Sequence, residues 1–415
     1  MMIKGNYLDD ENVQHSTSDR IISISLMSPF VILSIQFFIL NAFNLTSTIY
    51  TDLIMLSSKI VVGLFFLVAL PRVFQRSRLK ILVIYFIGFC VILYNYLVFP
   101  ENHQVMESII FPFFFMCLPA YIYCVSIENL KVLMSVMKET SYIVFIIGSL
   151  LSGLILSGFA SLGYYSMSLS YYMLLPAIIF LNELISRVNV HNFLLASISI
   201  FIILALGARG PLLCIAVFII LRLLKPLEKL KISHVINLIF IFGIITLVAI
   251  NIERILNALS NILSDFGLKS RSIRLFLSGD YHSSGRDVLY NELIYQIKNS
   301  PLLGIGIAGD RRVLPAAYAH NIILEILAHF GVVLGGILIL ILFFLVFRSL
   351  IMESNFNYTL LVVWISLGLT HLMVSSSYLI DLKFWIFLGI LTKLIKLNMS
   401  SNENHYLRLQ IESYK

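Results

Sequence analysis

The chain has 415 residues, of which 59% are hydrophobic and only 12% are charged. A soluble globular domain carries about 25% charged and roughly 45–50% apolar residues, so this composition excludes that class. Apolar stretches of about 20 residues recur along the chain, and each is long enough to cross a bilayer as a helix. The sequence therefore predicts an all-α fold, a polytopic membrane helix bundle.

About twelve apolar windows, separated by charged residues or by Pro and Gly, are predicted to span the membrane. They cover residues 21–43, 52–70, 79–99, 105–125, 142–159, 166–185, 192–207, 210–224, 234–251, 320–347, 357–376 and 382–398. The seventh and eighth windows are short and are joined tightly from Gly207 to Pro211, so they form either two spans or a broken re-entrant pair. Two spans are favoured, because the charges of the loops then alternate consistently.

The basic residues gather on one side of this arrangement. With a cytoplasmic N-terminus, the inner short loops hold twelve lysines and arginines, whereas the outer short loops hold only Arg209 and Lys383. This pattern places the tails 1–20 and 399–415 in the cytoplasm, and the first span is expected to be a signal anchor. It also accounts for most of the net charge of +7, so no nucleic-acid partner is expected. The four cysteines lack paired or metal-ligand spacing.

One long connection, residues 252–319, separates spans 1–9 (21–251) from spans 10–12 (320–398) and is predicted to lie outside. Apolar residues at helical spacing predict two surface helices within it. The first covers 251–263 with Ile252, Ile255, Leu256, Leu259 and Leu263, and the second covers 287–297 with Val288, Leu289, Leu293, Ile294 and Ile297. The chemistry of the protein is expected near this loop.

Three outer-side residues are candidates for chemistry. Arg209 lies between two glycines, where its guanidinium and the exposed backbone amides would suit a phosphate or diphosphate; the alternative is an arginine that snorkels to the interface. Arg286 follows Ser283, Ser284 and Gly285 at a predicted helix start and would also suit an anion, or it is a solvated arginine paired with an acidic neighbour.

His320 opens the tenth span. Its imidazole could exchange a proton near neutral pH, with Asn321 and Glu325 in the same local site; the alternative is a helix-capping or interface histidine. Helical spacing places Glu325 and His329 on one face and leaves His320 off that line.

Weaker signals surround these candidates. The glycine-rich stretch 301–309 resembles a phosphate loop but lacks the Lys-Ser/Thr that would follow, so it is interpreted as a flexible turn beneath the active surface. Arg311 and Arg312 add positive charge that would attract an anionic lipid-linked substrate or lipid headgroups. No paired acidic motif is evident on the outer side, so no metal is predicted.

Two stretches, SGRDVLYNELIYQIKNSPLLGIGIAGD from Ser284 and AYAHNIILEILAHFGVVLGGI thereafter, resemble the signature region of the O-antigen polymerase and O-antigen ligase superfamily. The shared features are a Gly-Arg within a long late loop, a "pLlGiG" turn and a His-Asn that opens the next span. The Arg-Gly at 209–210 also matches an arginine of this superfamily, although Ala208 stands where members often carry serine or threonine. The resemblance covers about a quarter of the chain in residues and the whole chain in topology.

The resemblance implies an inner-membrane glycosyltransferase that acts without cofactor or metal. Such proteins transfer a glycan from an undecaprenyl diphosphate carrier to an acceptor hydroxyl on the periplasmic face, with inversion at the anomeric carbon as the expected outcome. By resemblance, Arg209 and Arg286 would bind the diphosphate and stabilise the leaving group, and His320 would position or deprotonate the acceptor hydroxyl. Arg311, Arg312, Asn321 and Glu325 are further candidate substrate-binding residues. The expected partners are lipid-linked oligosaccharide repeat units, the bilayer, and a chain-length regulator and flippase of the same pathway.

Three functions remain open within this interpretation. A polymerase would use another lipid-linked repeat unit as the acceptor, whereas a ligase would use a sugar of the lipid A core. The composition, rich in Ile, Phe, Tyr and Ser with few Ala, resembles that of the divergent polymerases of surface polysaccharide. This resemblance favours an O-antigen polymerase for lipopolysaccharide biosynthesis. A lipid-linked oligosaccharide flippase is less favoured, because a transporter should carry charges near mid-membrane or symmetry between its halves.

Overall fold

The computed structural model describes residues 3–46, 49–157, 167–206, 208–225, 243, 250–265, 273–274, 277, 286–315 and 318–413. These residues form helices and turns without any strand, as the predicted all-α class requires. Most of the predicted ninth span, Gly207 and loop residues 278–285 lie outside the described residues. The chain divides into two compact units, one made of residues 1–69 and 129–282 and the other of residues 70–128 and 283–415.

Five helical stretches within the described ranges are long and apolar enough to cross a membrane: Ser16–Ala42, Tyr50–Val98, Pro100–Ser126, Leu169–Ser186 and Ile322–Met352. Four of them each match one predicted span, and Tyr50–Val98 covers the two spans predicted at 52–70 and 79–99. The total of twelve spans stays a prediction.

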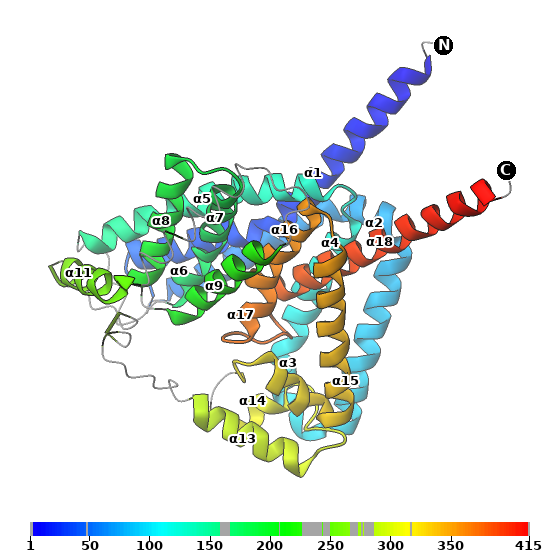
Figure 1. Cartoon of the computed structure of the whole chain (residues 1–415). Coiled ribbons are helices and arrows are strands. Elements are labelled where there is room, and N and C mark those ends of the chain that lie inside the picture. Colours follow the sequence, from blue (N-terminus) through cyan, green and yellow to red (C-terminus); the bar gives the residue numbers. More distant parts are fainter. Residues whose placement is uncertain are drawn as a thin grey trace. The chain divides into compact units, whose positions relative to one another are not determined.

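The first unit packs helices from two separate parts of the chain, before residue 70 and after residue 128 (Figure 1). Its elements are α1 (Ile3–Ala42), the first part of α2 (Tyr50–Val98), α5 (Leu130–Leu156), α6 (Met167–Tyr172), α7 (Leu174–Ser186), α8 (Val190–Ala205), α9 (Arg209–Leu224) and α11 (Ile252–Asp265). α1 packs on α5, and α7 packs on α5, α8 and α9. The predicted seventh and eighth windows thus form two separate helices, α8 and α9.

Polar contacts in this unit join helix ends that the charge pattern places on the same side. Arg20 at the start of the first span bonds to Glu139 on α5 at 3.0 Å, and Lys138 pairs with Glu183 on α7 at 2.6 Å. Arg222 of α9 donates to Asn182 of α7 at 3.2 Å. These pairs connect α1 to α5, α5 to α7, and α7 to α9 within the unit.

The second unit holds the remaining described elements. They are the second part of α2, the turn η1 (Pro100–Asn102), α3 (His103–Pro112), the π-helical turn η2 (Phe113–Cys117), α4 (Leu118–Ser126), α13 (Arg286–Asn299), α14 (Gly309–Val313), α15 (Ile322–Met352), α16 (Asn355–Trp364), the π-helical turn η3 (Ile365–Leu369), α17 (Thr370–Leu372) and α18 (Leu382–Ser413). α18 packs against α4, α15 and α16. Trp364 and Phe387 are completely buried in this unit.

α2 consists of two helices that meet at a kink, and these two helices correspond to the spans predicted at 52–70 and 79–99. The backbone leaves the helical conformation only at Ser77 (φ −138°, ψ 27°), within the predicted inner loop. Ser126 donates to the Ser77 hydroxyl at 2.7 Å, and Arg76 donates to the Ser126 carbonyl at 3.3 Å. A local break held by side chains therefore replaces the expected loop.

α15 is interrupted where the glycine-rich turn 301–309 packs against it. At Gly331 the backbone adopts φ 74° and ψ 176°, and the amide of Val332 donates to the carbonyl of Pro301 at 2.7 Å. The amide of Ile305 donates to the carbonyl of Ala328 at 2.7 Å. The break at Gly331 leaves the Val332 amide and the Ala328 carbonyl without partners in the helix, and the turn supplies partners for both groups.

The same turn is fixed from the other side by two buried asparagines. Asn102 donates to the carbonyl of Ile305 at 2.7 Å, and Asn95 accepts from the amide of Ile307 at 2.8 Å. The turn therefore joins α15 to the end of α2 and to η1, and it gives the region beneath the start of α15 a defined backbone.

Candidate functional site

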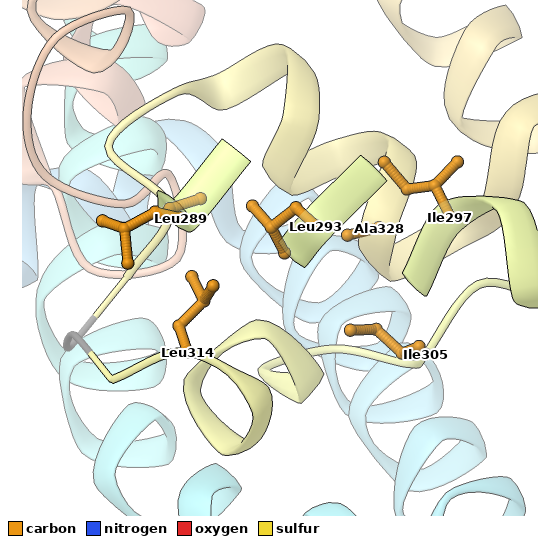
Figure 2. Close-up of a cluster of buried hydrophobic side chains, with 7 residues drawn as sticks. Leu289, Leu293, Ile297, Ile305, Leu314 and Ala328 are labelled. Atoms are coloured by element: carbon orange, nitrogen blue, oxygen red, sulfur yellow. The ribbon is translucent and has the colours of Figure 1, made fainter. Parts of the chain in front are cut away.

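The helix predicted at 287–297 is present as α13, and it docks on α15 through one line of side chains. Leu289, Leu293 and Ile297 are buried at the spacing of one helical face and pack in a cluster with Ile305, Leu314, Ala319 and Ala328 (Figure 2). Two residues expected on this stripe lie outside it: Val288 and Ile294 are 62% and 39% exposed. The buried line of α13 packs against α15 and against Ile305 and Leu314, and the side chains outside this line remain exposed.

This docking places Arg286, the first residue of α13, beside the C-terminal part of the unit. The Nη2 atom of Arg286 donates to the carbonyl oxygen of Val374 at 2.7 Å. Val374 belongs to the connection between α17 and α18, which we call the 373–381 segment. The guanidinium is half-buried and is therefore held by the protein while still partly open to solvent.

His320 lies close to Arg286 and has an unusual backbone. Its φ is 57°, a left-handed conformation that costs a non-glycine residue of order 1–3 kcal/mol and is concentrated at functional sites. The Tyr290 hydroxyl, one turn after Arg286 on α13, lies 3.5 Å from the His320 carbonyl, and the Tyr318 ring lies 4.4 Å from the imidazole ring. The imidazole Nδ1 is buried and has no hydrogen-bond partner among the described residues.

The surroundings of His320 favour its neutral form. Burial, and secondly the positive charge of Arg286, lower the pKa of His320 to about 4. The imidazole is therefore uncharged at neutral pH and has a nitrogen able to accept a proton.

The lowered pKa predicts a pH-dependent contribution of His320 to stability. Between its unfolded value near 6.5 and about 4, the unfolded chain binds a proton at this residue that the folded chain does not. Stability is therefore expected to fall as the pH decreases through this window. The unfolding temperature of wild type should decrease relative to that of His320→Gln between pH 6.5 and pH 4.5, as followed by thermal unfolding of the purified protein. Parallel curves for the two proteins would contradict the prediction.

Asn321 acts as the N-cap of α15. Its Oδ1 accepts from the amides of Ile323 and Leu324 at 3.0 and 3.3 Å. The side-chain oxygen that was expected to contact substrate therefore caps the first turn of α15. This cap also fixes the position of His320, the residue that directly precedes it in the chain.

The two neighbouring arginines of α14 differ in their partners. Arg312 donates to Asn102 at 3.2 Å and lies 4.0 Å from a Glu101 carboxylate oxygen, so its guanidinium is engaged by the protein. The Nε and Nη2 atoms of Arg311 are buried without a hydrogen-bond partner within the described chain. One carboxylate oxygen of the neighbouring Asp310, Oδ2, is likewise buried without a partner within the described chain.

A buried polar cluster lies beside this site and was missed by sequence reasoning. Asp310 of α14 and Glu325 and His329 of α15 have 0–1% exposure, and their ligand atoms lie within 4.8 Å of one another. Sequence reasoning placed Glu325 and His329 on one helical face, but Asp310 reaches them only through the glycine-rich turn. Ser377 and Tyr378, which are further members of the cluster, lie in the short outer connection predicted between the spans 357–376 and 382–398.

The cluster satisfies most of its own polar atoms. His329 Nε2 lies 2.8 Å from Asp310 Oδ1, and His329 Nδ1 lies 2.9 Å from the Tyr378 hydroxyl. Burial disfavours the charged form of Asp310, but His329 and then Arg311 outweigh it and lower the pKa of this carboxyl. Asp310, Glu325 and His329 have the donor types of a divalent-cation site, but the nearby charge of Arg311 and the internal hydrogen bonds also account for the arrangement.

Glu325 has protein partners where a substrate contact was expected. Its carboxylate accepts hydrogen bonds from the Ser377 hydroxyl and, at 3.4 Å, from the Tyr378 amide. With 0% exposure, this side chain contributes to the architecture of the site.

Arg209 belongs to the first unit and is described there by itself. It is the first residue of α9, after the N-cap residue Ala208, and it is half-buried. The predicted first loop helix, now α11, packs through Leu256 and Leu259 in a cluster with Ala205 at the end of α8. α11 therefore packs beside the end of α8, four residues before Arg209 in the chain.

Comparison with known proteins gives one match. A family model described as O-antigen ligase matches residues 194–341, a stretch that includes Arg209, Arg286 and His320. The match supports membership of the O-antigen polymerase and ligase superfamily. Neither the curated proteins nor the solved structures gave a match.

Proposed function

We propose that this member of the O-antigen polymerase and ligase superfamily is a polymerase of surface polysaccharide. It would transfer a growing glycan from undecaprenyl diphosphate to a hydroxyl group of another lipid-linked repeat unit. The observation that carries the proposal is the arrangement of Arg286 and His320, in which a held guanidinium adjoins a neutral imidazole with an unpaired, buried Nδ1. Transfer from a diphosphate to a hydroxyl needs one group for the leaving anion and another for the proton.

The chemical step then balances as follows. The acceptor oxygen forms a bond to the anomeric carbon, and the bond from that carbon to the diphosphate oxygen breaks with its electron pair on undecaprenyl diphosphate. The hydroxyl proton passes to the neutral imidazole of His320. Arg286 stabilises the charge that develops on the departing diphosphate, and attack from the opposite face inverts the anomeric centre.

Two other arginines extend the anion-binding role. Arg311 has unpaired buried guanidinium nitrogens and could contact the carrier's phosphates. Arg209 keeps the diphosphate-binding role implied by the resemblance. Arg312 is not included, because Asn102 and Glu101 engage it. No metal or cofactor takes part in the proposed step.

The proposed setting is the bacterial inner membrane, with both chain termini in the cytoplasm and the reaction on the periplasmic face. The pattern of basic residues and the five apolar helices support this setting. A flippase that delivers repeat units and a regulator of chain length are the partners that such a reaction would require.

The alternative within the superfamily is a ligase, and the match to a family model described as O-antigen ligase fits either activity. The same Arg286 and His320 would serve it, because the leaving group is unchanged and only the acceptor differs.

Complementation of a gene deletion tests the polymerase against the ligase. The deletion strain receives wild type, Arg209→Ala, Arg286→Ala or His320→Ala, and its lipopolysaccharide is separated on a silver-stained gel. Loss of a polymerase leaves the core with one repeat attached, whereas loss of a ligase leaves bare core with polymer still on the carrier. Single carrier-linked repeats on the cytoplasmic face would instead indicate a flippase. An unchanged ladder with all three variants would overturn the proposed site.

A further inference from the structure

The 373–381 segment connects the buried polar cluster to Arg286. Its Val374 carbonyl accepts the hydrogen bond from the guanidinium, and three residues later the Ser377 hydroxyl donates to Glu325. The backbone between these two contacts contains Ser376, whose φ of 63° is left-handed. A strained conformation of this kind persists only where its surroundings hold it, so the contacts around it must determine its shape.

Glu325 is placed to provide that hold. It lies on α15 one turn after the N-cap Asn321, so its position is coupled to the helix start that carries His320. Its two carboxylate oxygens accept separately, one from the Ser377 hydroxyl and the other from the Tyr378 amide. The Glu325 side chain thereby holds two successive residues of the segment, Ser377 and Tyr378, by hydrogen bonds.

The remaining members of the cluster fix Tyr378 on its other sides. The Tyr378 hydroxyl lies 2.9 Å from His329 Nδ1, and its carbonyl accepts from the indole of Trp385 on α18 at 2.7 Å. Every described polar atom of Tyr378 thus has a partner, and α15 and α18 both restrain the segment. Val374, four residues before Tyr378, is the residue of the segment that contacts Arg286.

We propose that Glu325 is a positioning residue: by holding Ser377 and Tyr378 it fixes the Val374 carbonyl that orients the Arg286 guanidinium beside His320. This inference rests on the proposed function, because Arg286 is taken to bind the diphosphate. It gives Glu325 a role through Arg286 in place of a contact with substrate. Displacement of a substrate-binding group by about 1 Å can reduce a rate by two orders of magnitude, so a modest shift of the segment should be measurable.

Binding of farnesyl diphosphate to the purified full-length protein in nanodiscs provides the test. Ser377→Ala removes one hydroxyl without a change of charge and should weaken binding on the order of tenfold; Glu325→Ala should weaken it at least as much. Glu325→Gln retains an acceptor for Ser377 and should bind more tightly than Glu325→Ala. The matched control is Glu353→Ala, which removes a buried carboxylate at the other end of α15, where it accepts from Asn357 and Asn398. This control should bind like wild type even if its unfolding temperature decreases.

A double-mutant cycle with Arg286→Ala separates positioning from a merely structural effect. If Glu325 acts through Arg286, Ser377→Ala should add little to the loss already caused by Arg286→Ala. Additive losses would overturn the inference, as would wild-type binding by both Ser377→Ala and Glu325→Ala while Arg286→Ala binds weakly. Wild-type protein that does not bind the probe, or Arg286→Ala that binds it normally, would overturn the proposed function and this inference together.

Discussion

Arg286→Ala is expected to reduce the rate of glycan transfer by about 10²–10³, equivalent to roughly 3–4 kcal/mol of transition-state stabilisation. The reason is that a guanidinium aimed at a departing diphosphate contributes most when the charge on the leaving group is greatest. The fold should be little affected, because Arg286 is half-buried and the loss of its hydrogen bond to Val374 costs about 1–3 kcal/mol at most. The measurement is the initial rate with purified protein and a lipid-linked repeat unit.

Two further variants make this result specific. Arg286→Lys keeps the charge but loses the planar, two-pronged donor geometry, so its rate should lie between those of alanine and wild type. Arg312→Ala removes an arginine of the same unit whose guanidinium is engaged by Asn102 and Glu101, and it should retain most of the activity. Equal losses for Arg286→Ala and Arg312→Ala would indicate a general effect of positive charge and would contradict the assigned role.

Gly331→Ala is expected to destabilise the protein by about 3 kcal/mol or more. The backbone at Gly331 (φ 74°, ψ 176°) is in a region that is essentially restricted to glycine. In addition, a Cβ atom there would lie 2.4 Å from the Leu302 carbonyl oxygen, which is backbone and cannot turn aside. The expected result is a large decrease of the unfolding temperature in detergent. It can be measured by size-exclusion chromatography of samples heated to increasing temperatures.

Gly336→Ala is the matched control on the same helix. A Cβ atom at this position meets nothing within 4 Å, and replacement of a helical glycine by alanine stabilises by roughly 0.5–1 kcal/mol. The two variants should therefore shift the unfolding temperature in opposite directions. A similar decrease for both would mean that α15 tolerates no added methyl group, and that the break at Gly331 has no special role.

Local features of the site could be predicted from the sequence. The loop helices were found because apolar residues recur at helical spacing, and α11 and α13 begin and end within two residues of the expected limits. The start of α15 follows from Asn321, a residue type that favours the N-cap. Such signals act within one or two helical turns and are therefore present in the sequence itself.

The buried cluster could not be predicted in the same way. Asp310 and His329 are 19 residues apart, and Glu325 and Ser377 are 52 residues apart, so their contacts depend on how separate elements pack. The exposure of Val288 has a related cause, because periodicity shows which residues share a face but not how much of that face a neighbour covers. The short kink between the two helices of α2 could not be predicted either, because charged residues at 72–80 indicate a loop although they are compatible with helix.

The docking of the glycine-rich turn against α15 fixes the length of the chain between His320 and Gly331. His320 precedes the helix at one end of this stretch, and the helix break at Gly331, against which the turn packs, lies at the other end. A single inserted residue would rotate one end relative to the other by about 100° and advance it by about 1.5 Å. Side chains between the two ends could be exchanged for others of similar size, whereas an insertion or deletion would direct the imidazole away from Arg286. In protein engineering, the residue types of this stretch could therefore be varied, but its number of residues should be kept.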